Sequence, residues 1–398
     1  MTILSNRIER LAESETIAMS QRSRDLRAQG HDVINLSLGE PDFNTPDTIK
    51  DAGIQAINDN VTHYPPVPGF PEVRKAIAEK LLRDNGVKYT PDQIVLSTGA
   101  KQSLMNVVLC LINPGDEVLV ATPYWVSYKA MVDFAEGNFK EVHADVEQDF
   151  KLSPEQLDAA LTDKSKLFMF SSPSNPTGAA YSESELRALG EVFKKYPKVH
   201  IISDEIYEHI RFEGEHFSLA AIPELYDRVI TVNGVSKSFA MTGWRIGYIA
   251  ASLPIAKACT KMQGQFTSAP SGISQMATLK AMETSADELK EMVNAFAKRR
   301  EVMIEGLEQI EGMICNRPEG AFYLFPKVSA LFGKKSNSQP IEDASALCMY
   351  LLNEAHVATV PGTAFGAPNY IRLSYAASEA ELKEALRRIK SAIEALTS

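Results

Sequence analysis

A lysine in the segment GVSKSFAMTGWRIG (234–247) has the surroundings of a reactive amine. Lys237 lies between two serines just after the apolar run VITVN, and Arg245 follows between Gly243 and Gly247. A lysine at the carboxyl end of a strand lies where open α/β sheets bind ligands, and burial can lower its pKa enough for Schiff-base chemistry. The hydroxyl groups and the arginine suit a phosphate. The alternative is a loop lysine, with Arg245 in a surface ion pair.

A carboxylate and a phenol follow another candidate strand, VHIIS (199–203). Asp204 comes directly after this run, and Tyr207 lies a few residues further on. A carboxylate buried at a strand end can pair with a cation or with a protonated ring nitrogen. The competing interpretation is a helix N-cap, because aspartate before glutamate is a common helix start signal.

Two more loops follow strand-like runs. SSPSNPTGAAYS (171–182) is either an ordinary turn or a loop that points the Asn175 amide into the same crevice. STGAKQS (97–103) lies at a strand-to-helix junction, where the backbone N–H groups of a helix start bind phosphate well. A small-residue turn is the plainer alternative for that segment.

An arginine also interrupts the apolar strand pattern YIRLSYA. Burying Arg372 is costly unless the side chain meets an anion, which is either a ligand or a structural ion-pair partner. Tyr64 in THYPPVPG, Trp125 in PYWVSY and Gly39 in LGEPDF stand in similarly distinctive segments.

The composition is that of an ordinary globular protein. Of 398 residues, 44% are hydrophobic and 23% are charged, and the net charge of −10 argues against nucleic acid or an anionic membrane as the main partner. The chain shows no apolar run long enough for a membrane span and no secretion signal, and its four cysteines are far apart. We therefore expect free thiols and a cytoplasmic location. The histidines are scattered, so we expect no metal site.

Apolar runs alternate with helical patterns through the middle of the chain, which predicts an α/β fold with a mostly parallel sheet covered on both faces. The runs are 93–98, 116–123, 166–173, 199–205, 228–234 and 244–251. After about residue 285, a long amphipathic helix, short strand patterns and a final helix indicate a smaller α+β lobe, which the opening residues complete. We predict a large domain over 44–285 and a small domain from 1–43 and 286–398.

Together these segments resemble the fold type I pyridoxal-phosphate enzymes, and within them the class I aminotransferases. The motifs LGEPDF, YWVSY, SNPTG, SDEIYEHI and NGVSKSFAMTGWRIGY occur in the expected order over nearly the whole chain, and they are most similar to the bacterial subgroup Iβ aspartate aminotransferases. The resemblance implies a seven-stranded sheet in the large domain, pyridoxal 5′-phosphate as cofactor, and a homodimer with shared active sites. It further implies transfer of the amino group from an L-amino acid, aspartate first, to 2-oxoglutarate by a ping-pong route, giving oxaloacetate and L-glutamate.

The resemblance also implies roles at the cofactor. Lys237 would hold it through a Schiff base and then move a proton between the substrate Cα and the cofactor C4′. Asp204 would keep the pyridine nitrogen protonated, and Tyr207 and Asn175 would hydrogen-bond the phenolic oxygen. Trp125 would stack on the ring and also contact the substrate. The residues around the phosphate would be Gly99, Ala100, Lys101, Ser236 and Arg245, with Tyr64 from the neighbouring subunit.

At the substrate, Arg372 would clamp the α-carboxylate, with help from Gly39 and Asn175. Lys101 and Thr16 would meet the distal carboxylate, because the distal-carboxylate arginine of the best-known aspartate subgroup is not recognisable in this chain.

Two other positions depart from patterns seen in relatives. Gly234 stands where many relatives carry a phosphate-binding serine. Ala12 stands where members that also accept prephenate tend to carry a lysine. The sequence therefore supports transamination more strongly than it supports specificity for dicarboxylic substrates.

Other functions remain open from the sequence. One is a different enzyme of the same fold, such as a broad or aromatic aminotransferase, a C–S β-lyase or an aminocyclopropane-carboxylate-type lyase. Another is an aminotransferase-like sensor domain of a transcription regulator. We expect an enzyme, because the chain shows neither spare residues nor a basic region for a DNA-binding domain.

Overall fold

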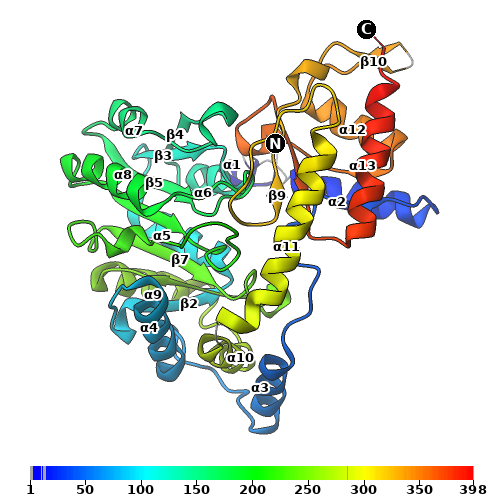
Figure 1. Ribbon diagram of the computed structural model, residues 1–398. Helices are drawn as coiled ribbons and strands as arrows, with labels where there is room; N and C mark the ends of the chain where they lie inside the picture. Colours follow the sequence, from blue (N-terminus) through cyan, green and yellow to red (C-terminus); the bar gives the residue numbers. More distant parts are fainter. Residues whose placement is uncertain (1–2, 10, 12–14, 285, 337, 398) are drawn as a thin grey trace.

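The protein, described here by a computed structural model over residues 3–9, 11, 15–284, 286–336 and 338–397, is built around a seven-stranded sheet (Figure 1). All its strands are mutually parallel except β8, which runs antiparallel to both neighbours. The predicted α/β fold with a mostly parallel sheet is confirmed. In spatial order the strands are β2 (Ile94–Thr98), β8 (Ile246–Ala250), β7 (Val229–Gly234), β6 (His200–Asp204), β5 (Ser165–Ser171), β3 (Glu117–Thr122) and β4 (Asn138–His143).

The apolar pattern predicted all of these strands except β4, which forms the edge of the sheet next to β3. Its sequence, NFKEVH, contains two charged residues, and Val142 is its one buried position. An edge strand can expose polar side chains on both faces, and charges there discourage pairing with other chains. The hydrophobic pattern therefore does not reveal this strand.

Helices cover both faces of the sheet, and each face has its own apolar core. Side chains of alternate strand positions divide between the two layers, so Val232 packs with one and Val229 with the other. This explains the unbroken apolar runs. One layer contains α5 (Ala100–Leu111), α6 (Ser127–Phe134) and α9 (Leu253–Phe266). The other contains α3 (Asp47–Asn58), α4 (Pro71–Asn85), α7 (Pro154–Ala160), α8 (Glu183–Lys195) and α10 (Gly272–Glu283).

The two ends of the chain form a smaller lobe, in which the blue and red segments of Figure 1 meet. β1 (Ile34–Asn35) pairs in parallel with β12 (Val357–Ala358), and a small antiparallel sheet has the order β13 (Val360–Pro361), β14 (Ile371–Ser374), β9 (Tyr323–Leu324). Its helices are α2 (Glu15–Ala28), the long α11 (Ala286–Leu307), α12 (Ala344–Glu354) and α13 (Glu379–Glu394). Short elements are α1 (Asn6–Glu9), β10 (Lys335–Ser336) and β11 (Gln339–Pro340). The domain boundaries stay a prediction.

The parallel strands end at one edge of the sheet, and this brings the candidate residues together. β2 is parallel to β7 because both pair antiparallel with β8, so β2, β3, β5, β6 and β7 all end at the same edge. The loops that carry Gly99, Trp125, Asn175, Asp204 and Lys237 leave from these five ends. Ligands of open α/β sheets bind at this edge.

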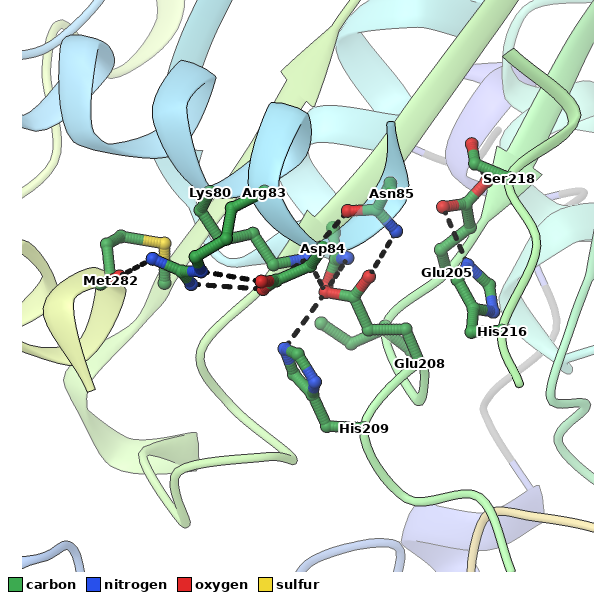
Figure 2. Close-up of polar contacts among 12 residues, drawn as sticks. Lys80, Arg83, Asp84, Asn85, Glu205, Glu208, His209, His216, Ser218 and Met282 are labelled. Carbon is green, nitrogen blue, oxygen red and sulfur yellow. Dashed lines mark hydrogen bonds and ion pairs between the residues drawn. The ribbon is translucent and has the colours of Figure 1, made fainter. Parts of the chain in front are cut away.

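A buried ionic network braces two of these loops (Figure 2). Lys80 of α4 forms an ion pair with Glu208, whose carboxylate also accepts hydrogen bonds from Asn85 Nδ2 and Asn233 Nδ2, both at 2.8 Å. Asn233 Oδ1 in turn accepts the N–H of Gly234 at 2.7 Å. Burial opposes ionisation of Glu208, but Lys80, His209 and His216 together outweigh it and hold the pKa of Glu208 well below its ordinary value. The network ties the chain after Asp204 to the chain before Lys237.

A second buried carboxylate, Glu205, lies beside this network. It accepts hydrogen bonds from Ser203 Oγ at 2.9 Å and Ser218 Oγ at 2.8 Å, and His216 Nε2 lies 3.0 Å from it. Glu205, Glu208 and His216 offer ligand atoms within 4.8 Å of one another, an arrangement that the sequence did not reveal. Glu208 already has Lys80 as its counter-ion, and Glu205 already accepts the two serine hydroxyls, so we assign this group a structural role.

Candidate active site

A cavity of about 270 Å³ opens at the carboxyl edge of the large sheet, where it meets the smaller lobe. All predicted site residues except Gly99 and Tyr64 line it. The complete lining is Thr16, Ile17, Gly39, Ala100, Lys101, Leu104, Trp125, Val126, Ser127, Ser171, Asn175, Asp204, Ile206, Tyr207, Ser236, Lys237, Thr242, Arg245 and Arg372.

Lys237 lies in the cavity wall and is not a surface loop lysine, and Arg245 lines the same cavity. Its ammonium donates a hydrogen bond to the carbonyl oxygen of Gly39 and lies 5.9 Å from the centre of the Tyr207 ring. Burial lowers the pKa of the Lys237 amine to about 8; Glu40 opposes this change, and Arg372 and Arg245 add to it. An amine with such a pKa is partly neutral near physiological pH, so it can act as a nucleophile and as a base.

Asp204 is a buried carboxylate at the end of β6, and no helix begins after it. Its Oδ2 accepts a hydrogen bond from the hydroxyl of Tyr128 at 2.7 Å, and its Oδ1 accepts the N–H of Ile206 at 3.3 Å. Residues 206–209 form a turn and not a helix, so the helix-cap interpretation is wrong. Burial raises the pKa of Asp204 to about 6, although both hydrogen bonds oppose this. A cation or a protonated ring nitrogen would stabilise the ionised form.

Arg372 has the contacts of an anion receptor. Only 2% of its surface is exposed, and its guanidinium donates to Asn175 Oδ1 at 2.9 Å and to the Ser37 carbonyl oxygen at 2.7 Å. Its Nε is buried without a hydrogen-bond partner, and no carboxylate in the described part of the chain pairs with it. A structural ion pair therefore does not explain this buried arginine, and a bound anion would.

The start of α5 forms a second anion-binding feature. The first amides of a helix have no partners within the helix, and its dipole favours a negative charge. Gly99 caps this helix with φ +82°, and a Cβ atom there would lie 2.3 Å from Arg245 Nη2. A Cβ on Gly247 would lie 2.1 Å from the amide nitrogen of Ala100. Gly99 therefore leaves room for Arg245, and Gly247 allows β8 to approach the backbone at the helix start closely.

The same packing explains the glycine at position 234. A Cβ atom there would lie 2.8 Å from the carbonyl oxygen of Ile246 and 2.9 Å from Gly247 Cα. A serine does not fit without a shift of the backbone. Ser236, which lines the cavity, remains as a hydroxyl at this end.

Lys101 and Trp125 form one wall of the cavity. The Lys101 ammonium lies 5.0 Å from the centre of the Trp125 ring, within the range of a cation–π contact. Burial and then Arg245 lower the pKa of Lys101. Thr16 lines the cavity from α2, and its Oγ1 is buried without a hydrogen-bond partner.

Two expectations concern positions away from this cavity. Tyr64 is 96% exposed and does not line it. Ala12 lies outside the described residues.

Two tyrosines that the sequence did not indicate contact site residues. Tyr128 donates to Asp204, and the Tyr323 hydroxyl lies 2.7 Å from the Tyr207 hydroxyl. Tyr128 follows Trp125 at one helical turn in YWVSY, which could have indicated its position. Tyr323 comes from the distant segment GAFYLFP, whose apolar composition suggests only core.

The charges of the cavity favour anionic ligands. Among the described residues, Lys101, Lys237, Arg245 and Arg372 line it together with one carboxylate, Asp204. The cations divide between two places, with Arg245 at the helix start and Arg372 in the smaller lobe. Such a site can hold a phosphate at one end and a carboxylate at the other, with an amine and a carboxylate between them.

Comparison with known proteins decides which family has this site. Residues 31–389 match the sequence model of the family described as aminotransferase class I and II. The chain belongs to that family. It is a pyridoxal-phosphate-dependent aminotransferase, as the resemblance of its motifs predicted.

The similarity to individual family members covers essentially the whole chain. It is 47% identical over 394 residues to the aspartate/prephenate aminotransferase of Cereibacter sphaeroides, covering 98% of both chains. The crystal structure of the aspartate aminotransferase from Rhizobium meliloti superposes with a TM-score of 0.96 at 44% identity, covering all of both chains. The aspartate aminotransferase of Thermus thermophilus with maleate gives a TM-score of 0.92 at 40% identity, covering 98% of this chain and 100% of the other.

The cavity suits the cofactor of this aminotransferase family. Pyridoxal phosphate has a dianionic phosphate, a basic ring nitrogen and a carbonyl that amines attack. The helix start with Gly99 and Arg245, the carboxylate of Asp204 and the amine of Lys237 offer a partner for each. In the described part of the chain no helix is long and apolar enough to cross a membrane.

Proposed function

We propose that this aminotransferase prefers L-aspartate as amino donor and 2-oxoglutarate as acceptor, and that it releases oxaloacetate and L-glutamate in a ping-pong cycle. The observation that carries the proposal is that the cavity holds two further cations besides Lys237 and Arg245, and that they come from separate elements: Lys101 from α5 and Arg372 from β14. A dicarboxylic substrate can use both. The named activity of the relatives, and the maleate in the Thermus thermophilus structure, support the same substrate class.

The site residues predicted from the sequence have separate roles in this proposal. Bound pyridoxal phosphate supplies an electron sink for the carbanion at the substrate Cα. Asp204 holds a proton on the pyridine nitrogen, and Tyr207 and Asn175 donate hydrogen bonds to the phenolic oxygen. The Lys237 amine would remove the proton from the substrate Cα and return it at C4′.

The remaining groups bind and orient. Ala100, Ser236 and Arg245 would hold the phosphate at the start of α5, and Trp125 would contact the pyridine ring. Arg372 binds the α-carboxylate, which fixes the Cα–H bond relative to Lys237. Lys101 and Thr16 bind the distal carboxylate.

We expect variants of Arg372 and Lys101 to separate the two ends of the substrate. Arg372→Met should lower kcat/KM for every donor, because all amino acids carry the α-carboxylate. The loss should correspond to roughly 2–5 kcal/mol of transition-state stabilisation. Lys101→Ala should lower kcat/KM for aspartate and glutamate about 10-fold or more, but change alanine and tyrosine much less, since only acidic donors lose a charge partner.

The measurement is steady-state kinetics over acidic and neutral donors at saturating cofactor, with cofactor affinity determined in parallel because Lys101 also lies at the start of α5. Prephenate belongs among the acceptors, because relatives are named for it. An equal loss on all donors from Lys101→Ala would contradict its role in specificity. Pyruvate and ammonia as products would instead indicate a β-lyase.

We further propose that the protein is a homodimer in which Tyr64 completes the partner's cofactor site. Its 96% exposure supports a contact outside its own chain. Mixing Tyr64→Ala and Lys237→Ala subunits should then restore about a quarter of wild-type activity, because one site of each mixed dimer has both residues intact. Sedimentation should first show that each variant is dimeric. If mixed dimers then recover no activity, Tyr64 does not contribute to the partner's site.

We also propose a cytoplasmic location. The four cysteines are free thiols in the structure, as expected for a reducing compartment. Fractionation of cells with an antibody against the protein tests this; recovery outside the cytosolic fraction would contradict it.

A further inference from the structure

Tyr323 contacts the active site without lining the cavity. It lies in β9, is fully buried, and its hydroxyl is 2.7 Å from the hydroxyl of Tyr207. The two rings meet edge to face, with centroids 5.9 Å apart at 81°. The two phenols come from separate parts of the fold, since Tyr207 follows β6 of the large sheet.

Two more cavity residues touch the same tyrosine. The Arg372 guanidinium lies over the Tyr323 ring, 4.6 Å from its centre. The Tyr323 hydroxyl also faces Gly39, where a Cβ atom would lie 2.8 Å from it. One side chain therefore contacts the phenol proposed for the cofactor, the arginine proposed for the α-carboxylate, and the glycine whose carbonyl oxygen binds Lys237.

The role of Tyr207 determines which of the two hydroxyl groups donates the hydrogen bond. Each phenol has one proton to donate, and geometry alone allows either to be the donor. If Tyr207 donates its proton to the phenolic oxygen of the cofactor, Tyr323 must donate to Tyr207. A chain of donors strengthens each of its bonds, because the first bond polarises the second hydroxyl.

We propose that Tyr323 is a positioning residue: its hydroxyl donates to Tyr207 and thereby aims the Tyr207 proton into the cofactor site. This rests on the role of Tyr207 in the proposed function. The Tyr323 ring also packs against the Arg372 guanidinium, and a phenylalanine at this position would retain that packing. Tyr323→Phe therefore removes the hydroxyl contact alone.

The test is an absorbance titration of the cofactor-bound enzyme, which follows protonation of the cofactor's linkage to Lys237. Tyr323→Phe should raise the titration midpoint by up to about one pH unit, since a weaker hydrogen bond from Tyr207 favours the protonated form. In the same variant kcat should fall about 3- to 10-fold, with KM for the amino donor nearly unchanged. Tyr207→Phe should give a larger midpoint shift, and the double variant no further shift.

Tyr375→Phe is the matched control. Tyr375 is also fully buried in the smaller lobe, but its hydroxyl donates to the Ala321 carbonyl oxygen at 3.4 Å. This variant should leave the midpoint unchanged.

Four results would overturn the proposal. They are an unchanged midpoint in Tyr323→Phe when Tyr207→Phe shifts it, additive shifts in the double variant, a fall in the midpoint, and an equal shift in the Tyr375 control. An unchanged midpoint in Tyr207→Phe itself would instead reject the cofactor role of Tyr207, and with it this inference.

Discussion

Replacing Lys237 with alanine should reduce turnover by more than about 10⁴-fold, because in the proposed mechanism this amine both binds the cofactor and moves the proton. Pyridoxal phosphate should still bind, since Asp204 and Arg245 remain in place. Steady-state kinetics measures the first effect, and equilibrium dialysis of the purified variant measures the second.

The matched control is Lys257→Ala, which removes an exposed lysine from α9. It should retain wild-type activity. Activity of Lys237→Ala within about tenfold of the wild type would contradict a role in proton transfer, whatever the cofactor content of the variant.

Asp204→Ala should lower kcat on the order of 10³-fold or more, because an unpaired ring nitrogen loses its proton and the cofactor accepts electrons less well. Asp204→Glu should lose much less, since it retains a carboxylate. Tyr128→Phe is a useful control, because it removes the hydroxyl that donates to Asp204 but keeps the carboxylate. Near-normal kcat in Asp204→Ala would show that the carboxylate has a structural role alone.

Asp204 should also cost stability in the cofactor-free protein. Burial raises its pKa from the ordinary 3.8 to about 6, so at pH 4–6 the folded state binds more protons than the unfolded chain, and the free energy of unfolding falls as pH rises. At about 1.4 kcal/mol per pKa unit, the cost above pH 6 is about 3 kcal/mol. Asp204→Asn lacks this charge.

Urea unfolding of the cofactor-free proteins at several pH values measures this cost. Asp204→Asn should be more stable than the wild type at pH 7.5, and the difference should close as pH falls toward 4. Adding pyridoxal phosphate should narrow the gap at pH 7.5, because the protonated ring compensates Asp204. The same substitution at exposed Asp51 should change stability little. A variant less stable than the wild type at every pH would contradict this account.

The sequence predicted those parts of the molecule that follow from local patterns. Buried parallel strands read as apolar runs, and small-residue loops after them mark the ligand edge, so Lys237, Asp204 and Asn175 were found together. The apolar pattern did not predict β4, because an edge strand needs no apolar face. A buried strand and the ligand-binding loop after it are both encoded by short segments, so a local pattern can reveal them.

The rest depends on contacts between distant segments. Tyr323 meets Tyr207 across 116 positions, and Lys80 meets Glu208 across 128, so no spacing in the sequence links either pair. The sequence alone could not decide whether Asp204 is a helix cap or a buried carboxylate. The residues after it match a helix start signal, but the structure forms a turn there. Burial, which sets the pKa values of Lys237 and Asp204, is likewise a property of the whole fold.

Borohydride reduction of the cofactor-bound enzyme, followed by peptide mapping, tests the central claim most directly. Reduction makes the bond between the cofactor and its lysine permanent, so the modified residue can be identified by mass. We predict one phosphopyridoxyl group per chain, on Lys237. A label on any other lysine, or no label with cofactor bound, would contradict this account of the active site.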